Sequence, residues 1–367
     1  MTLLSKPEPT IPSHWYFDAD HYKRELEVIW YREWVCVGRE DALARTGDYV
    51  AAEIGDQSLI VTRTENGLRA FHNTCRHRGA QICSKESGRF RNGRIICPYH
   101  TWTYSLDGEL LATPNRLDTG SFDQANYPLY SVHLDTWRGF IFINLAEEPA
   151  TTLIDQLGTE ANWVRNWPLE DMRSVHQVTK SVASNWKIYW ENYSECYHCP
   201  RIHPSLCHVM PVYKLGTFDS REIPDWTRED DGDAVTWTPD GKSTLPDIEG
   251  LSESERETVV TFAEFRASMY IVAHRDYVRT VRLMPRGPEK VELIVDWLLP
   301  SKHADVSNET LQPIIDFPTQ VIVEDAEMCE LNQKGLRSLR HHHGALVEQE
   351  YDICNFHQWL RGKLGES

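Results

Sequence analysis

The chain has 367 residues, which at about 150 residues per domain predicts two or three domains. With 38 Lys and Arg against 55 Asp and Glu, its formal net charge is −17, so it lacks the basic surface that nucleic acids and anionic membranes require. No apolar segment is long enough for a transmembrane helix or a signal peptide. We therefore expect a soluble, cytoplasmic protein that acts on a small molecule, and its nine cysteines are expected to be reduced thiols or metal ligands.

The predicted elements, in chain order, form a helical start, a β-rich region and a larger mixed region. Residues 13–35 carry aromatic and aliphatic residues at helical spacing, and short β-rich segments alternate with turns from about 37 to 146. Residues 150–175 are predicted to be helical, and a short strand and a helix beginning near Asn185 follow. An acidic, turn-rich segment over 215–260 is expected to be exposed. Two or three strands over 268–300 and a mainly helical C-terminal region complete an α+β chain.

Two short loops in the β-rich region each carry one cysteine and one histidine. They contain Cys75-x-His77 and, further on, Cys97-x-x-His100. Structural zinc fingers group two Cys in one loop and two His in the other. One thiolate and one imidazole per loop instead suit a two-iron cluster in which one iron takes both thiolates and the other both imidazoles, as in a Rieske [2Fe–2S] centre. Zinc on the same ligands, or four buried residues without a metal, are the alternatives.

A second group of candidate ligands lies in NWKIYWENYSECYHCPRIHP, which covers residues 185–204. Glu195 and His198 are spaced i, i+3, and Pro200 is predicted to end the helix near His198, which places His203 in the following loop. On an unbroken helix, two His at i, i+5 would point about 140° apart. The predicted break would let both imidazoles converge on one ion. Two His and a carboxylate with open positions form the ligand set of non-haem Fe(II) sites that use O2.

The carboxylate is expected from VIVEDAEMCELNQKGL in the C-terminal region. Asp325 shares a helical stripe with Ile322, Cys329 and Leu336, whereas Glu324 lies off that stripe. Because a carboxylate that faces a core without a partner is costly, metal ligation would explain its position. A buried Asp325 paired with an Arg, or a misjudged helical phase, is the alternative.

These motifs resemble those of Rieske non-haem iron oxygenase α subunits. CRHRGA and CPYHTWTYSLDG resemble the Rieske domain, and N-x-x-E-x-Y-H-x4-H, from Asn192 to His203, resembles the catalytic domain. With the late E-D-x4-E-L-x-Q-x-G-L segment, the resemblance spans nearly the whole chain. Respiratory Rieske proteins carry an extra cysteine in each loop. Ala80 and Tyr99 stand there in this chain, which favours the oxygenase class over quinol oxidation.

The resemblance implies a fold and two metal centres. The expected fold is α+β, with an N-terminal helical segment (1–37) packed on the catalytic domain, an all-β Rieske [2Fe–2S] domain (38–149), and a larger, helix-grip-like catalytic domain with an antiparallel sheet (150–367). Cys75, His77, Cys97 and His100 would hold the [2Fe–2S] cluster. The mononuclear Fe(II) would be held by His198, His203 and Asp325. Glu195 would carry electrons between subunits, with Asn192 beside it as a further catalytic residue.

The resemblance also implies a function and partners. The chain would be a terminal oxygenase component that uses O2 and electrons from a flavin and iron–sulfur reductase or a ferredoxin. NAD(P)H would be involved only through that reductase. The chain would form an α3 homotrimer. At the position of Glu195, aromatic-ring dioxygenases usually have Asp. Glu at this position is similar to the carnitine and glycine-betaine monooxygenase group, which favours a quaternary or methylated amine substrate. Ring hydroxylation or O-demethylation of an aromatic acid, and a Rieske electron-transfer protein without oxygenase activity, are the other hypotheses.

Aromatic residues of the mixed region are candidates for a substrate pocket. They would suit a quaternary ammonium through cation–π contacts, or a flat aromatic substrate, or they would be ordinary core. The candidates are Tyr213, Phe218, Phe262, Phe265, Tyr270, Tyr277 and Trp297. Two further motifs mimic metal sites: Cys196-x-x-Cys199 is expected to be structural, and His341–His343 is expected to be a solvated loop.

Overall fold

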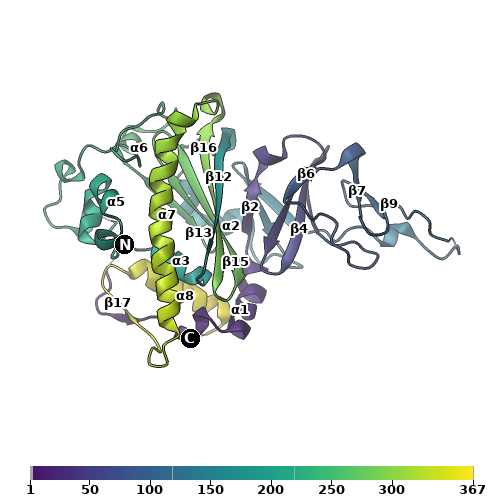
Figure 1. The fold of residues 1–367 in the computed structure, drawn as a ribbon, viewed down its shortest axis with the longest axis horizontal. Helices are drawn as coiled ribbons and strands as arrows, with labels where there is room; N and C mark the ends of the chain where they lie inside the picture. Colours follow the sequence, from purple (N-terminus) through teal and green to yellow (C-terminus); the bar gives the residue numbers. More distant parts are fainter. Residues whose placement is uncertain (1–2, 118, 219, 367) are drawn as a thin grey trace. The chain divides into compact units, whose positions relative to one another are not determined.

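The computed structural model describes residues 3–117, 119–218 and 220–366 and divides the chain into two compact units (Figure 1). One unit combines residues 1–29 with residues 158–367, and the other contains residues 30–157. The N-terminal segment is thus part of the same unit as the C-terminal region. The two unit boundaries lie before 37/38 and after 149/150, the positions expected from the sequence.

The unit of residues 30–157 is built from three antiparallel sheets. One has the order β5-β4-β3-β6, the second β10-β11-β2 and the third β7-β8-β9. Their strands are β2 (Val35–Arg39), β3 (Asp48–Ile54), β4 (Gln57–Thr64), β5 (Gly67–His72), β6 (Ser87–Arg89), β7 (Arg94–Ile96), β8 (Thr103–Ser105), β9 (Leu110–Ala112), β10 (His133–Trp137) and β11 (Phe140–Asn144). The short helix α2 (Leu153–Leu157) ends the unit. Cys75 and Cys97 belong to its buried core, which includes Phe71 and Tyr104.

The other unit contains a five-stranded antiparallel sheet in the order β12-β16-β15-β14-β13. Its strands are β12 (Met172–Val182), β13 (Thr261–Phe265), β14 (Met269–Ala273), β15 (Val278–Gly287) and β16 (Lys290–Pro300). The long helix α7 (Asn308–Leu336) crosses one face of this sheet (Figure 1). Trp297 of β16 fixes the helix there, since its indole N–H donates to the Ile314 carbonyl over 2.7 Å.

Shorter elements complete this unit. They are β1 (Glu8–Pro9), α1 (Ala19–Glu25), α3 (Trp186–Tyr193), α4 (Cys199–Ile202), α5 (Pro204–Val209), α6 (Glu253–Glu257), β17 (Ala345–Leu346) and α8 (Tyr351–Leu364). The single helix expected over 13–35 is wrong. Residues 13–16 form a 3₁₀ turn, Asp18 caps the N-terminus of α1 through the His21 N–H, and residues 26–30 form a π turn.

The helix expected near Asn185 is present, but it ends earlier than expected. Asn185 caps α3 by accepting the Lys187 N–H, and α3 ends at Tyr193 rather than near His198. The Glu195 carboxylate accepts the backbone N–H groups of Tyr197 and His198, which stabilises a separate turn after α3. Pro200 then lies in the first turn of α4, where its missing N–H costs nothing.

The acidic segment over 215–260 contains short 3₁₀ turns and α6. Much of it is exposed, but Thr236, Trp237 and Thr238 are buried, so the expectation that the whole segment is exposed is wrong for this part. Among the described residues, no helix is both long and apolar enough to cross a bilayer.

Candidate metal centres and active site

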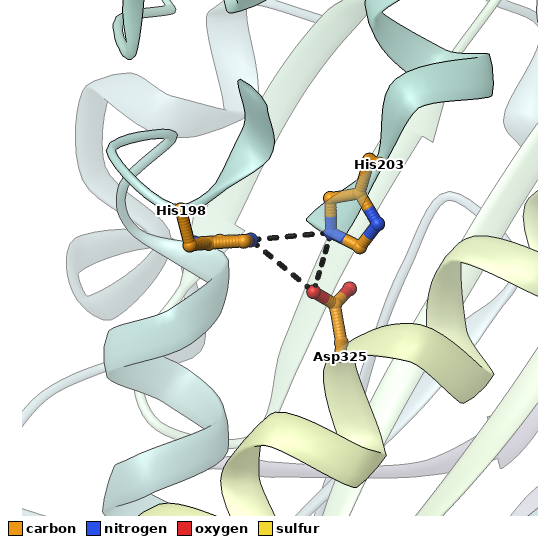
Figure 2. A group of neighbouring side chains, drawn as sticks. All are labelled: His198, His203 and Asp325. Atoms are coloured by element: carbon orange, nitrogen blue, oxygen red, sulfur yellow. Dashed lines mark hydrogen bonds and ion pairs between the residues drawn. The ribbon is translucent and has the colours of Figure 1, made fainter. Parts of the chain in front are cut away.

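His198, His203 and Asp325 converge in space although they come from three places in the chain (Figure 2). His198 precedes α4, His203 lies between α4 and α5, and Asp325 lies on α7. The two Nε2 atoms are 3.2 Å apart, and Asp325 Oδ1 lies 2.8 Å from His203 Nε2 and 3.3 Å from His198 Nε2. All three potential ligand atoms lie within 4.8 Å of one another. This is a spacing at which one metal ion could contact all three.

Each of these three side chains is held by a further polar group. Nδ1 of His198 lies 2.6 Å from Glu195 Oε1, and Nδ1 of His203 lies 2.7 Å from Glu324 Oε2. The Asn192 amide donates to Asp325 Oδ1 over 2.8 Å. Because carboxylates engage both Nδ1 atoms, both Nε2 atoms face Asp325 across the position that a metal would take, as is usual for metal-binding histidines. The role of Glu324 was missed by the sequence analysis, which placed it off the apolar stripe of α7.

The charges of this cluster favour a divalent cation. Burial alone lowers the pKa of His198, but the hydrogen bonds and charges of Asp325 and Glu195 outweigh burial and raise this pKa to about 10. Burial raises the pKa of Asp325, but its hydrogen bonds to both histidines bring this pKa down to about 2. Three carboxylates therefore surround two imidazoles, since Glu324 also contacts His203. A bound metal ion would compensate this negative charge in place of the protons.

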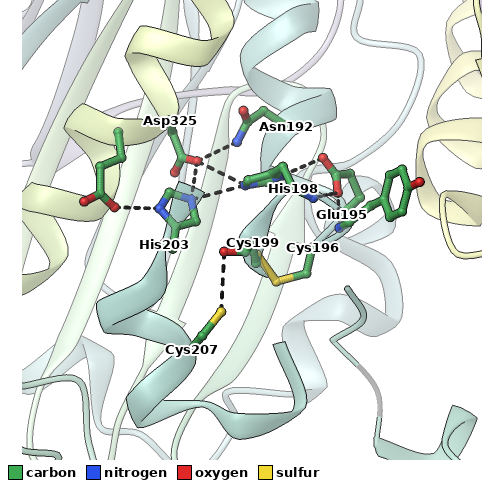
Figure 3. Close-up of a disulfide and its surroundings, with 10 residues drawn as sticks. Asn192, Glu195, Cys196, His198, Cys199, His203, Cys207 and Asp325 are labelled. Atoms are coloured by element: carbon green, nitrogen blue, oxygen red, sulfur yellow. Dashed lines mark hydrogen bonds and ion pairs between the residues drawn. A yellow bond between two sulfur atoms is a disulfide. The ribbon is translucent and has the colours of Figure 1, made fainter. Parts of the chain in front are cut away.

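A disulfide joins Cys196 and Cys199 in the turn that carries His198 (Figure 3). Their Cα atoms are 4.9 Å apart, within the usual range for disulfides. The prediction that the nine cysteines are reduced or bind metal is therefore wrong for this pair, because the turn after α3 brings residues i and i+3 together. The other seven cysteines are free. The Cys207 thiol contacts the Cys199 carbonyl.

A cavity of about 50 Å³ adjoins the cluster of His198, His203 and Asp325. Four of the aromatic residues expected from the sequence line it, namely Tyr213, Phe218, Phe262 and Tyr270. Phe265, Tyr277 and Trp297 are buried elsewhere and do not line it. The sequence analysis missed Tyr193, Trp237 and Arg279 in this lining, as well as the aliphatic Leu206 and Val321. The cavity is therefore a largely aromatic chamber beside the candidate metal site.

A larger cavity of about 1470 Å³ shares Tyr213, Phe218 and Phe262 with the first one. Its walls come mainly from the acidic segment over 215–260. The acidic residues among them are Glu229, Asp231, Asp233, Asp247, Glu253 and Glu257, whereas the basic ones are Arg256 and Arg275. The outer cavity is therefore acidic on balance, which attracts cations.

The Cys/His loops of the unit of residues 30–157 form a second candidate centre. Cys75 and Cys97 are buried, and the Nδ1 atoms of His77 and His100 lie 3.2 Å apart. The Tyr104 hydroxyl lies 3.2 Å from Cys75 Sγ. Two imidazole nitrogens so close together, with two buried thiols from the same two loops, fit a cluster in which one iron takes both histidines.

Comparison with known families identifies both units. Residues 33–126 match the "Rieske [2Fe-2S] domain" family, and residues 169–366 match the family described as "Ring hydroxylating alpha subunit (catalytic domain)". The chain belongs to the ring-hydroxylating α-subunit family. As a member of this family it is an oxidoreductase that uses O2 and electrons from a reductase, with a Rieske [2Fe–2S] domain and a non-haem iron catalytic domain. The predicted family and fold class are confirmed.

Several relatives in this ring-hydroxylating family act on quaternary ammonium compounds. The glycine betaine monooxygenase oxygenase subunit of Chromohalobacter salexigens is 27% identical over 95% of this chain and 84% of its own length. The carnitine monooxygenase oxygenase subunit of Escherichia coli K12 is 38% identical, over only 55% of this chain and 54% of its own length. The chain thus aligns with about half of that relative.

Solved structures share the fold across almost the whole chain. The quaternary ammonium Rieske monooxygenase CntA in complex with L-carnitine superposes with a TM-score of 0.77 at 22% identity, covering 98% of this chain and 96% of that chain. Naphthalene 1,2-dioxygenase from Rhodococcus sp. bound to indole superposes with a TM-score of 0.75 at 20% identity, covering 98% of this chain and 95% of that chain. Because these two proteins differ in substrate class, the shared fold does not choose between amines and arenes.

Proposed function

We propose that the chain is the terminal oxygenase subunit of a monooxygenase that oxidises a quaternary or methylated amine, with cleavage of a C–N bond. The observation that carries this proposal is the aromatic chamber beside His198, His203 and Asp325. Aromatic faces attract a quaternary ammonium through cation–π contacts, and the methyl groups of such a cation fill an apolar chamber. The chamber would bring an N-methyl or N-methylene C–H bond next to the metal site.

Two further observations favour the amine over the aromatic acid. The outer cavity is acidic on balance, which raises the local concentration of cations and repels anions. The glycine betaine and carnitine monooxygenase subunits named above support the same substrate class. Hydroxylation or O-demethylation of an aromatic acid is the second candidate, because the same aromatic walls would also hold a flat ring.

We assign the mononuclear iron to His198, His203 and Asp325, and the [2Fe–2S] cluster to Cys75, His77, Cys97 and His100. When bound, the two centres supply the electrons and the O2 chemistry of the reaction. Glu195 and Glu324 keep the protons of the two imidazoles on Nδ1, and Asn192 orients the Asp325 carboxylate. The aromatic walls position the substrate and exclude water from the reacting C–H bond.

We also propose an α3 homotrimer in which Glu195 passes electrons between subunits. The Glu195 carboxylate contacts the Nδ1 atom of His198, on the ring edge opposite the one that faces Asp325. It therefore touches the metal site without occupying it, as an electron bridge must. The study of CntA concerns inter-subunit electron transfer in that protein, which supports the same route here. The cytoplasmic location expected from the sequence stays a prediction.

The proposal is tested by a hydrogen peroxide-driven screen of the iron-loaded protein, with products identified by mass spectrometry. Peroxide supplies oxygen and electrons together, so no cognate reductase is needed. The panel compares betaines, carnitine and choline with benzoates, methoxybenzoates and simple arenes. We expect formaldehyde or an aldehyde fragment from an ammonium compound. A hydroxylated or O-demethylated arene, with no ammonium compound consumed, would refute the amine proposal.

A further inference from the structure

Three residues that line the inner chamber each carry a hydrogen-bond donor without a partner in the described part of the chain. These donors are the Tyr193 hydroxyl, the Trp237 indole N–H and the Arg279 Nε–H. All three atoms are buried, and none bonds to any group in the described part of the chain. Because an unsatisfied buried donor costs free energy, three around one cavity indicate a ligand with acceptor oxygens.

The guanidinium of Arg279 is the most unusual of these groups. Arg279 is 4% exposed, and its guanidinium lies over the ring of Trp237, 5.4 Å from Cζ to the centroid, with no ion pair to an acid among the described residues. Arg282, three residues later on β15, is also buried but forms an ion pair with Asp296 over 3.0 Å. Of the two buried arginines on β15, Arg282 is therefore paired with an acid, whereas Arg279 is not. An unpaired buried charge is strongly unfavourable, so Arg279 is poised for an external anion.

The strand register places Arg279 on the same face of the sheet as the aromatic walls. Tyr270 pairs with Val281, and Arg279 lies two residues before Val281, so Tyr270 and Arg279 share a face. Tyr270 also pairs with Glu264, and Phe262 lies two residues before Glu264. Arg282 lies on the opposite face. The chamber thus has an aromatic wall and a guanidinium on one sheet face, and α7 brings Asp325 to it.

Glu264 is the one acidic side chain that this register brings to the same face, but it does not pair with Arg279. No ion pair joins the two among the described residues, and burial, with the charge of Asp352, raises the pKa of Glu264 to about 7. Burial also raises the pKa of Tyr193, so its hydroxyl keeps its proton and remains a donor. An internal acid therefore does not take the place of the missing anion.

We propose that Arg279, Tyr193 and Trp237 form a carboxylate-binding subsite, so that the substrate is a zwitterion with a methylated ammonium group and a carboxylate. This inference rests on the proposed function for the ammonium end of the substrate. Arg279 binds the carboxylate by charge-assisted hydrogen bonds, with the hydroxyl and indole N–H as further donors. The aromatic walls hold the cation at the other end. The chamber then selects betaines over amino alcohols, whose hydroxyl leaves the guanidinium unpaired.

The test compares trimethylammonium carboxylates with alcohols of the same chain length on the holoenzyme. The pairs are glycine betaine with choline, and γ-butyrobetaine with 4-trimethylammonio-1-butanol, and the measured quantities are KM and kcat for product formation. For at least one pair, we expect the wild-type KM to be ~10-fold or more lower for the carboxylate, as expected for hydrogen bonds to a charged group. Arg279→Gln should raise the carboxylate KM by a similar factor and leave that of the alcohol nearly unchanged. Arg286→Gln, on the same strand but outside both cavities, is the matched control.

Two conservative variants keep the test decisive if Arg279→Gln does not fold. Tyr193→Phe and Trp237→Phe each remove one unpartnered donor and retain an aromatic ring. Without substrate, Tyr193→Phe should be at least as heat-stable as the wild type, since only a buried unsatisfied hydroxyl is lost, whereas Trp237→Phe also leaves a void beside Arg279 and should be less stable. Each should nevertheless raise the carboxylate KM several-fold. If these side chains only supported the fold, a variant that keeps its heat stability would also keep its KM for the carboxylate.

The outcomes separate this inference from the proposed function. Equal KM values for carboxylates and alcohols in the wild type, or equal losses for both in the folded variants, would overturn the carboxylate subsite and leave the amine proposal standing. If neither kind of trimethylammonium compound is consumed, the proposed function fails and the zwitterion with it. Turnover of a benzoate that depends on Arg279 would keep the carboxylate subsite and refute the amine class.

Discussion

Replacing Glu195 by Gln tests whether this residue only positions His198 or also conducts electrons. Both carboxylate oxygens of Glu195 are in use: Oε1 contacts His198 Nδ1 over 2.6 Å, and Oε2 accepts the backbone N–H groups of Tyr197 and His198. Glutamine offers only one acceptor oxygen, so its NH2 group must face a donor on one side. One of these contacts is therefore lost.

Glu324 provides a matched control on the other imidazole. Its Oε2 contacts His203 Nδ1 over 2.7 Å, and its Oε1 accepts the Gln320 amide over 2.8 Å. Glu324→Gln therefore causes the same kind of loss at the same kind of ligand. Loss of such a partner weakens metal binding about 10- to 100-fold, which corresponds to roughly 1.4 to 2.8 kcal/mol. We expect both variants to need correspondingly more Fe(II) for half-maximal loading.

The assay compares reductase-driven with peroxide-driven product formation in each fully iron-loaded variant. Peroxide bypasses electron transfer between the centres, so the ratio of the two rates reports on that step alone. We expect the ratio to fall at least ~10-fold in Glu195→Gln and to remain near the wild-type value in Glu324→Gln, because only Glu195 is proposed to lie on the electron route. Equal ratios in the two variants would refute the electron role of Glu195 and leave it a positioning residue.

Three further predictions follow from contacts outside the chamber. Glu25→Gln breaks a buried ion pair with Lys187 (2.5 Å) and weakens a hydrogen bond from Trp186 (2.8 Å). It should therefore lower the free energy of unfolding by about 3 to 5 kcal/mol in denaturant titrations. A loss below about 1 kcal/mol would contradict this. Tyr104→Phe removes the hydroxyl that lies 3.2 Å from Cys75 Sγ. A redox titration should therefore show the reduction potential of the [2Fe–2S] cluster shifted negatively by tens of millivolts. An unchanged potential would show that this hydroxyl does not tune the cluster. The pKa of Glu264 is about 7 in the folded protein, above its ordinary value of 4.5. The fold therefore favours the protonated carboxyl. This contribution to the free energy of unfolding is fully present below pH 4.5 and is lost as the pH rises from 4.5 to 7. Glu264→Gln should therefore match the wild type near pH 4.5 and exceed its free energy of unfolding by up to about 3 kcal/mol at pH 8, and a pH-independent difference would exclude this role.

The sequence predicted most of what depends on local spacing. The pairs Cys75/His77 and Cys97/His100 sit in tight loops whose chemistry is visible in a few residues. Asp325 was found because the helical period of α7 placed it on a buried stripe.

What the sequence could not predict depends on contacts between distant segments. Tyr193, Trp237 and Arg279 meet only because the acidic segment folds back over the sheet and the strand register aligns β14 with β15. Glu324 was missed because helical phase alone cannot show that the turn between α4 and α5 approaches the flank of α7. The disulfide between Cys196 and Cys199 was missed because the cysteines of a chain without a signal peptide were expected to be reduced, and because the turn after α3 that brings these two together was not predicted.

The central claim is that His198, His203 and Asp325 hold an iron separate from the [2Fe–2S] cluster, and metal stoichiometry tests it most directly. Iron and acid-labile sulfide are measured per chain in the wild type and in Asp325→Ala, after reconstitution and removal of loosely bound metal. We expect about three irons and two sulfides in the wild type, and about two irons and two sulfides in the variant. Two irons in both proteins, or zinc in place of the third iron in the wild type, would contradict this claim.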